Sequence, residues 1–135
     1  MRKLLTESVF RNRPAGAEST GCVRRGLIAG QATLVDRRRA GFKTQIFALI
    51  RLTAKGREDL EAFSTAIKAF DEVLECHVTL GPTDFILRIV AEDIEAYERF
   101  FFQRLSRVPG VQEINSMVTL SEIKSTTALS LLSRI

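Results

Sequence analysis

The side chains of this chain that could do chemistry are few and widely separated. The sequence holds one histidine, His77, and two cysteines, Cys22 and Cys76, whose spacing is typical of neither a metal site nor a redox pair. A catalytic centre needs titratable groups that converge, and a lone histidine on a polar strand face is more often solvated or part of an interface. No glycine-rich phosphate loop follows a strand. The sequence therefore disfavours an enzyme and predicts no metal or cofactor site.

A four-residue turn, Gly81-Pro82-Thr83-Asp84, lies between two apolar runs in "VTLGPTDFILRIV". Tight hairpins usually turn on Asn-Gly or Asp-Gly, which tolerate positive backbone torsions. Gly81 is expected to serve the backbone, since glycine permits torsions and close approaches that other residues do not. Asp84 has two interpretations, a cap on its own turn or a ligand contact, and for an isolated Asp after Gly-Pro the cap is more common.

Length and composition indicate one domain with a real core, since the chain has 135 residues of which 45% are hydrophobic. The formal net charge is +4, and the basic side chains gather in the first third of the chain, while most acidic ones follow Glu58. Such clustering makes contact with a polyanion a hypothesis. The basic residues concerned are Arg2, Lys3, Arg11, Arg13, Arg24, Arg25, Arg37, Arg38, Arg39 and Lys43.

No apolar run approaches the ~20 residues of a membrane span, and no apolar stretch follows the basic N-terminus as in a secretory signal. Cys22 and Cys76 each lie beside apolar neighbours and are expected to be small buried residues. A cytoplasmic protein in a reducing compartment, without a membrane partner, is the expectation.

The chain divides into three parts by composition. Residues 1–25 mix arginine with Pro, Gly, Ser and Thr, and are expected to form a basic, poorly ordered arm. Residues 26–43 form a connector, with an extended piece at 27–35 and a turn at Gly41. Residues 44–135 show regular patterns and are expected to be the main domain with a C-terminal tail.

The main domain reads as six elements. Residues 44–52, "TQIFALIRL", form an apolar run of strand length, and further strands are expected at 72–80, 85–90 and 111 to about 123. A first helix follows Gly56, with its apolar stripe at Leu60, Phe63, Ile67 and Phe70. A second helix begins after an N-cap at Asp93 and ends before Pro109-Gly110, with its apolar stripe at Ile94, Tyr97, Phe101 and Leu105.

The order strand, helix, strand, strand, helix, strand predicts an α+β, ferredoxin-like βαββαβ fold, with a four-stranded antiparallel sheet and both helices on one face. The other sheet face would carry Phe47 and Leu49 and would be too apolar to face water. A second copy of the chain is the simplest cover, so we expect an obligate homodimer. An RNA-recognition module is disfavoured, because "FILRIVAE" lacks the basic-Gly-aromatic context that stacks bases.

Several segments in the correct order resemble the Lrp/AsnC, or feast/famine, family of transcriptional regulators. The matching features are a Val-Leu-Glu-Cys opening, the Gly-x-x-Asp-aromatic turn, a Leu-x-x-x-Pro-Gly-Val helix exit and a Lys-x-Thr-Thr-Ala-Leu tail. Together with "GLIAGQATLVD" they cover about three quarters of the chain. The resemblance implies a domain that binds an amino acid, dimerises through its sheet and assembles as a tetramer or octamer of chains.

The resemblance also implies a ligand site between dimers, near the hairpin. It places ligand contacts at Gly81, Thr83, Asp84, Ile94, Ser116, Met117, Val118, Thr119, Thr126 and Thr127. Asp84 would accept a hydrogen bond from the effector's ammonium group, and the alternative is that it caps its own turn. Pro82 and Thr83 are less typical of the family's turn, and Ser116 and Thr119 have a second interpretation as solvent-facing residues.

Members of this family usually carry a winged helix-turn-helix before the sensor, with a recognition helix in the major groove. Here about 25 residues precede Gly26, and they contain no helix pair, so that module is expected to be missing or truncated. Two functions remain open. The first is a regulator with weak DNA contact through Arg11, Arg13, Arg24 and Arg25. The second is a stand-alone ligand-binding and assembly module that acts through full-length relatives and does not bind DNA.

Overall fold

The chain has two units, of which the first is described only in part. The computed structural model describes residues 26–131, and the chain divides into the units Met1–Ala40 and Gly41–Ile135. The described part of the first unit, residues 26–40, contains no helix or strand, so the predicted extended piece at 27–35 forms no ladder. Asp36 closes one turn, because its carbonyl accepts from the Ala40 amide at 2.9 Å. The predicted arm at 1–25 and Cys22 lie outside the described residues.

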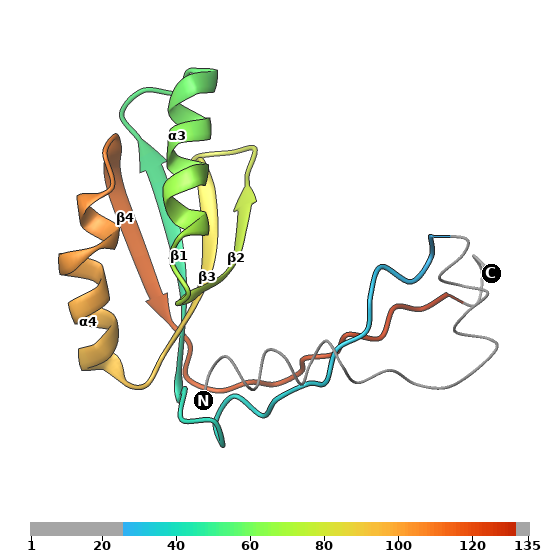
Figure 1. Cartoon of the computed structure of the whole chain (residues 1–135). Coiled ribbons are helices and arrows are strands. Elements are labelled where there is room, and N and C mark those ends of the chain that lie inside the picture. Colours follow the sequence, from blue (N-terminus) through green and yellow to red (C-terminus); the bar gives the residue numbers. More distant parts are fainter. Residues whose placement is uncertain (1–25, 132–135) are drawn as a thin grey trace. The chain divides into compact units, whose positions relative to one another are not determined.

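The second unit is a four-stranded antiparallel sheet with two helices on one face (Figure 1). Its elements are β1 (Thr44–Leu52), α3 (Arg57–Lys68), β2 (Val73–Val78), β3 (Phe85–Ala91), α4 (Ile94–Gln103), the 3₁₀ turn η1 (Leu105–Arg107) and β4 (Val111–Val118). The strands lie in the spatial order β2-β3-β1-β4. This arrangement confirms the predicted ferredoxin-like fold.

The core lies between the sheet and the helices. Every second residue of β1 and β3 faces the helices and is fully buried, as strand geometry requires of one sheet face. The rings of Phe63 on α3 and Phe85 on β3 lie 4.4 Å apart, between centroids. The side chains with at most 2% exposure are Ile46, Ala48, Ile50, Leu52, Phe63, Ile67, Phe85, Leu87, Ile89 and Leu105.

The helices begin where the sequence predicted. Asp93 caps α4, because its carboxylate accepts from the Ala96 amide at 2.7 Å. The predicted apolar stripe of α4 was partly wrong, since Phe100 is buried and Ile94 is 51% exposed. Phe100 and Phe101 both lie one turn after Tyr97, so periodicity cannot separate them. Packing does, because the Phe100 ring meets the edge of the Phe70 ring at 5.4 Å.

Two predicted strands are shorter in the structure, and one burial prediction was wrong. β2 ends at Val78 and β4 at Val118. Thr119 still donates its amide to the Gln45 carbonyl of β1 at 2.9 Å. Cys76 was expected to be buried but is exposed. β2 is an edge strand with a neighbour on one side only, which leaves Leu74 and Val78 exposed as well.

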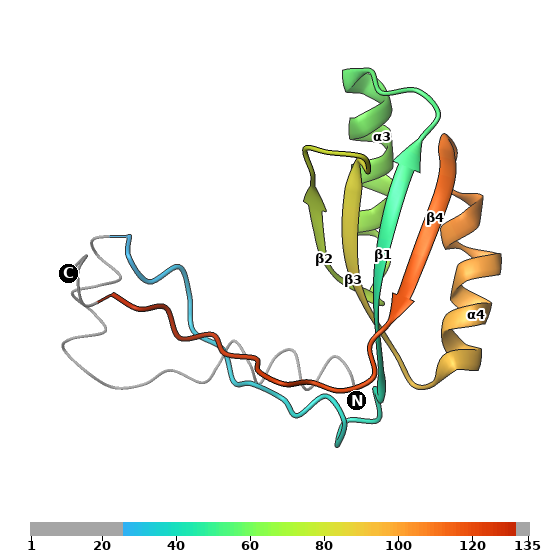
Figure 2. The same ribbon diagram turned by 180° about the vertical axis from the view of Figure 1, so that it is seen from behind.

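Within the second unit, both helices lie on one face of the sheet, and no helix or strand that the structure describes covers the opposite face (Figure 2). Phe47 and Leu49 of β1 point to this face, since they alternate with the buried residues. Ile86 of β3 lies opposite Leu49, and Met117 of β4, which is 50% exposed, lies opposite Phe47. We call this surface the open face.

Candidate functional site

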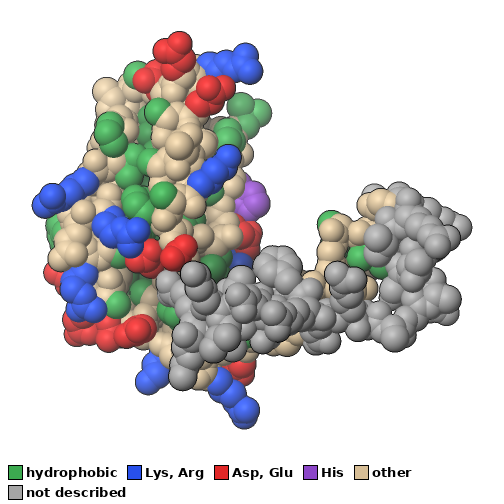
Figure 3. Space-filling model, viewed as in Figure 1, with side chains coloured by type: hydrophobic (Ala, Val, Ile, Leu, Met, Phe, Trp, Pro, Cys, Tyr) green, Lys and Arg blue, Asp and Glu red, His purple; other side chains and the backbone are tan. Residues whose placement is uncertain are grey.

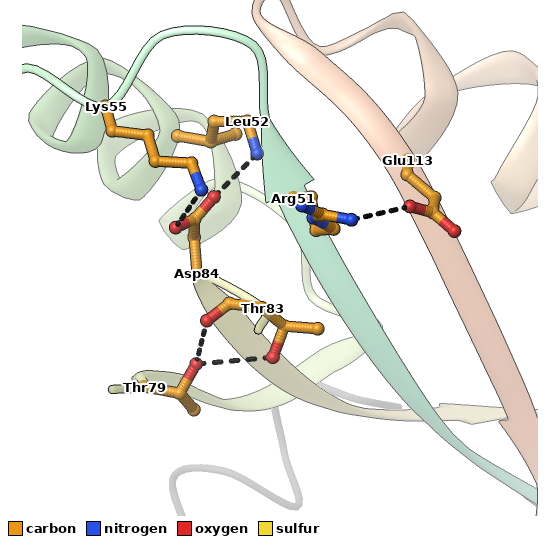
Figure 4. A network of polar contacts seen from close by, with 7 residues as sticks. All are labelled: Arg51, Leu52, Lys55, Thr79, Thr83, Asp84 and Glu113. Atoms are coloured by element: carbon orange, nitrogen blue, oxygen red, sulfur yellow. Dashed lines mark hydrogen bonds and ion pairs between the residues drawn. The ribbon is translucent and has the colours of Figure 1, made fainter. Parts of the chain in front are cut away.

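The hairpin between β2 and β3 is closed by its two threonines. The Thr79 hydroxyl donates to the Thr83 carbonyl at 2.7 Å and lies 3.4 Å from the Thr83 hydroxyl (Figure 4). The Thr79 amide also donates to the Asp84 carbonyl at 3.0 Å. The Thr79 side chain and the backbone of Thr83 therefore hold the loop shut, and the Thr83 hydroxyl adds only a longer contact.

Gly81 is needed for its torsion and not for space. Its φ is 152°, in the region that side chains rarely adopt, whereas a Cβ built on it would meet no atom within 4 Å. Any other residue would strain the backbone here. The side of Gly81 on which a Cβ would lie is open within this chain.

The carboxylate of Asp84 ties the hairpin to the end of β1 (Figure 4). Its Oδ2 accepts from the Leu52 amide at 2.8 Å, and its Oδ1 lies 3.6 Å from the Lys55 ammonium nitrogen. The Asp84 side chain is 15% exposed and that of Lys55 53%. The Asp84 side chain thus caps the end of the neighbouring strand β1 and not its own turn. Its second carboxylate oxygen faces the half-exposed ammonium of Lys55, which a ligand's ammonium group could displace.

The remaining predicted site residues lie at the other end of the sheet. Val118 of β4 pairs with Ile46 near the start of β1, while Asp84 binds Leu52 at the end of β1. About six residue steps at ~3.3 Å separate the two ends, or about 20 Å. Ile94 belongs to the Val118 end, because β3 ends opposite Thr44 just before α4 begins. One chain therefore does not bring the two predicted groups together.

Two residues of the second group, Ser116 and Thr119, make hydrogen bonds within the single chain. The Ser116 hydroxyl lies 2.5 Å from the Tyr97 hydroxyl of α4. Burial raises the pKa of Tyr97, and the bond to Ser116 partly opposes this. The Thr119 hydroxyl donates to the Gln45 carbonyl at 3.1 Å, so Thr119 extends the β1–β4 contact.

The tail residues Thr126 and Thr127 follow β4 in an irregular, exposed segment. The Thr126 hydroxyl accepts from the Ala128 amide at 3.0 Å, a local turn bond. Thr127 is exposed. The four arginines proposed as DNA contacts, Arg11, Arg13, Arg24 and Arg25, lie outside the described residues.

Two partners of predicted site residues were missed by sequence reasoning. Lys55, which faces Asp84, was not singled out from the sequence. Tyr97, which binds Ser116, was assigned to the helix stripe alone. A signal existed for Lys55, since a cation directly after a strand lies near the hairpin that pairs with that strand's end.

The open face carries one polar network amid its apolar side chains. Glu75 accepts from Arg88 Nε at 2.6 Å and from His77 Nε2 at 3.0 Å, and Arg88 also donates to the Gln45 side chain at 3.3 Å. These hydrogen bonds, first from His77 and then from Arg88, lower the pKa of Glu75. The network satisfies the charges before any partner covers this face.

A groove of about 310 Å³ lies between α4 and the ends of β2 and β3. Arg104 bridges it, with its guanidinium 2.8 Å from Glu72 and 4.8 Å from the centroid of the Phe70 ring. None of the predicted ligand contacts lines this groove. On the helix side of the molecule, acidic and basic side chains alternate, so no patch of a single sign dominates (Figure 3).

The part of the chain that the structure describes has neither a metal-binding cluster nor a membrane-spanning helix. Among residues 26–131, no group of three or more His, Cys, Asp or Glu side chains is placed to hold a metal ion. Within the same range, no helix is long and apolar enough to cross a membrane.

Known proteins resemble the chain over most of its length. Residues 45–129 match the family model described as the Lrp/AsnC ligand binding domain. The transcriptional regulator AzlB of Bacillus subtilis is 31% identical over 84% of this chain and 72% of its own, and the leucine-responsive regulatory protein of Escherichia coli is 29% identical over 82% and 68%. A transcriptional regulator of Neisseria meningitidis, solved as a complex with L-Met, superposes with a TM-score of 0.81 at 27% identity, over 87% of this chain and 75% of that one.

These relatives are transcriptional regulators and not enzymes, in agreement with the sparse titratable groups of the sequence. The family match covers the sheet, both helices and the predicted tail residues. The chain therefore belongs to the Lrp/AsnC family of transcriptional regulators and contains its ligand-binding domain.

Proposed function

We propose that this chain is the amino-acid-sensing and assembly part of a transcriptional regulator, with an effector site at the β2–β3 hairpin. The observation that carries the proposal is a carboxylate, Asp84, held rigidly by Leu52, with one oxygen facing only a partly exposed cation. A relative with 27% identity was solved with L-Met, which supports an α-amino acid as the ligand class.

The effector's ammonium group would bind Asp84 by a charge-assisted hydrogen bond. Gly81 leaves open space beside its backbone, which permits a ligand's close approach. In the same chain, residues 116–119 lie about 13 to 23 Å away along β1, and Ile94 lies at the same end of the sheet as Val118. A second dimer is therefore required if both groups, and the tail hydroxyls of Thr126 and Thr127, are to line one site.

We propose that the chain forms a homodimer through the open face, and that dimers assemble further into a tetramer or octamer. Half-buried Phe47 and Leu49, with Ile86 and Met117 beside them, form an apolar surface across three strands. Such a surface favours burial against a like surface, and an isologous two-fold contact pairs it with itself.

Replacing Asp84 by asparagine is expected to weaken binding of the effector by ~1.5 to 3 kcal/mol, the usual contribution of a hydrogen bond to a charged group. Isothermal titration calorimetry with the twenty L-amino acids measures this. Asparagine keeps an oxygen for the Leu52 amide, so the fold should survive where alanine would leave that amide unpaired.

Asp59 provides the matched control for this change. It is an exposed aspartate whose carboxylate accepts the Gly56 amide at the start of α3, so Asp59→Asn makes the same chemical change away from the hairpin. The control should bind as the unchanged chain does. Equal affinity for the Asp84 and Asp59 variants would remove Asp84 from the site.

Contact with DNA is proposed to be weak and indifferent to sequence. Arginine contacts to phosphates specify no bases, and we expect contacts of this kind from Arg11, Arg13, Arg24 and Arg25. A gel-shift series should therefore show affinity that falls steeply with salt and does not depend on the DNA sequence. Sequence preference that persists at physiological salt would instead support autonomous operator recognition. Complete loss of binding at low salt would favour a module that acts only through full-length relatives.

A further inference from the structure

We propose that Lys55 and Asp84 together form a two-point clamp that recognises both charged groups of an α-amino acid. The effector's ammonium group binds Asp84 Oδ1, and its carboxylate binds the Lys55 ammonium. This inference rests on the proposed amino-acid site and adds to it a specificity-determining residue, Lys55.

The anionic half of the clamp is fixed in place. The Asp84 amide donates to the Ile50 carbonyl at 2.8 Å, and the carboxylate accepts from the Leu52 amide at 2.8 Å. Backbone and side chain of Asp84 are thus both tied to β1, and the side chain is 15% exposed. A ligand group that binds Oδ1 meets a preorganised acceptor, which lowers the entropic cost of binding.

The cationic half is adjustable. Lys55 lies in the irregular segment between β1 and α3, and its side chain is 53% exposed. Its Nζ lies 3.6 Å from Asp84 Oδ1, a long and solvated ion pair that contributes little to folding. Lys55 can therefore shift toward a ligand without loss of the fold. The next cation in the chain, Arg57, already pairs with Glu61 at 3.3 Å.

The spacing of the two charges matches that of an α-amino acid. Standard N–Cα and Cα–C bond lengths place the ammonium nitrogen about 2.5 Å from the carboxylate carbon, so the nitrogen and the carboxylate oxygens lie about 3 Å apart. The Asp84 and Lys55 charges are 3.6 Å apart. An amino acid lying alongside this pair can therefore place its ammonium group against Asp84 and its carboxylate against Lys55.

Recognition at two points explains selectivity for a zwitterion. An amine without a carboxylate would compete with Lys55 for Asp84 and leave the lysine without a partner. A carboxylic acid without an amine would compete with Asp84 for Lys55. Only a ligand with both charges can contact both protein groups at once, so it gains a second charge-assisted interaction that a ligand with one charge lacks.

The test uses calorimetry on the whole 135-residue chain. The probes are the twenty L-amino acids and, for the tightest binder, its α-carboxamide, which lacks the negative charge, and its N-acetyl derivative, which lacks the positive one. The unchanged chain should bind the amino acid at least about tenfold more tightly than either derivative, since one charge-assisted hydrogen bond is lost. Lys55→Met should weaken binding of the amino acid about tenfold. It should bind the carboxamide at least as tightly as the unchanged chain does, since Lys55 no longer competes for Asp84.

Two further variants separate this role from a general effect of charge. Arg57→Met removes the same charge two residues away and should not alter binding. Lys55→Arg keeps a cation and should retain the preference for the amino acid over its carboxamide.

The contrary results are distinct. If Lys55→Met leaves the preference for the amino acid unchanged, or weakens both ligands equally, the clamp is wrong and the proposed amino-acid site stands. If the unchanged chain binds the amino acid and its carboxamide equally, the clamp is wrong, but the proposed amino-acid site still stands. If the unchanged chain binds none of the twenty amino acids, the proposed function and the clamp both fail.

Discussion

Replacing Leu49 by aspartate is expected to convert the proposed homodimer into a monomer. Leu49 lies at the centre of the open face, opposite Ile86 on β3 and Asn115 on β4. In a two-fold dimer the change would bury one carboxylate per chain without a partner, at a cost of several kcal/mol in all. The dissociation constant should rise by about 100-fold or more, because ~2.7 kcal/mol corresponds to that factor. Sedimentation equilibrium over a concentration series measures it.

Phe102 provides the control for the Leu49 variant. It lies on α4, on the helix side of the sheet, and is 60% exposed, so Phe102→Asp also puts an aspartate in place of an apolar residue. This control should remain a dimer, and far-ultraviolet circular dichroism should show both variants folded. A Leu49→Asp chain that is folded and still dimeric would mean that the chains do not associate through the open face.

Replacing Phe85 by alanine is expected to lower the free energy of unfolding by ~3 to 5 kcal/mol. Phe85 begins β3, is 0% exposed and packs its ring against Phe63 of α3 at 4.4 Å. The change removes apolar contact area and leaves a cavity at the junction of sheet and helix, and a β-sheet core closes such a cavity only in part. Urea unfolding followed by circular dichroism, at fixed protein concentration, gives the difference.

Phe102→Ala makes the same substitution at an exposed position and should cost less than about 1 kcal/mol. The pair of variants therefore separates burial from the loss of aromatic character. A loss at Phe85 no larger than at Phe102 would contradict the packing of β3 against α3 as the centre of the core.

Most of the fold could be predicted because its signals are local. β1 matched its predicted range, Thr44–Leu52, and Asp93 was recognised as an N-cap from its position alone. The errors occurred where local signals were ambiguous. Phe100 and Phe101 satisfy the same helical period, and Cys76 is exposed because its strand lies at the sheet edge. Strand order determines such burial, and strand order depends on long-range pairing.

The candidate site was less predictable than the fold. Family resemblance brought Asp84, Ser116 and Thr119 together as ligand contacts. It could not show that Asp84 lies at Leu52 of β1, whereas Ser116 lies beside Ala48 and Thr119 beside Gln45, about 13 and 23 Å further along that strand. It also could not show that Lys55 faces Asp84 across a separation of 29 residues in the sequence. Contacts of this kind depend on register, and a shift of one residue would turn each side chain to the other face.

The sequence by itself determined the element order, the apolar faces and the need for glycine at position 81. These features follow from backbone sterics and from the apolar periods of two residues in strands and 3.6 residues in helices. Each of these signals is contained within its own segment of the sequence. Only the tertiary structure decided what the Gly-Pro-Thr-Asp turn does. Thr83 closes the loop with Thr79, and Asp84 caps the end of β1 while it faces Lys55. The physical reason is that these partners come from separate segments, which approach one another only when the common core packs.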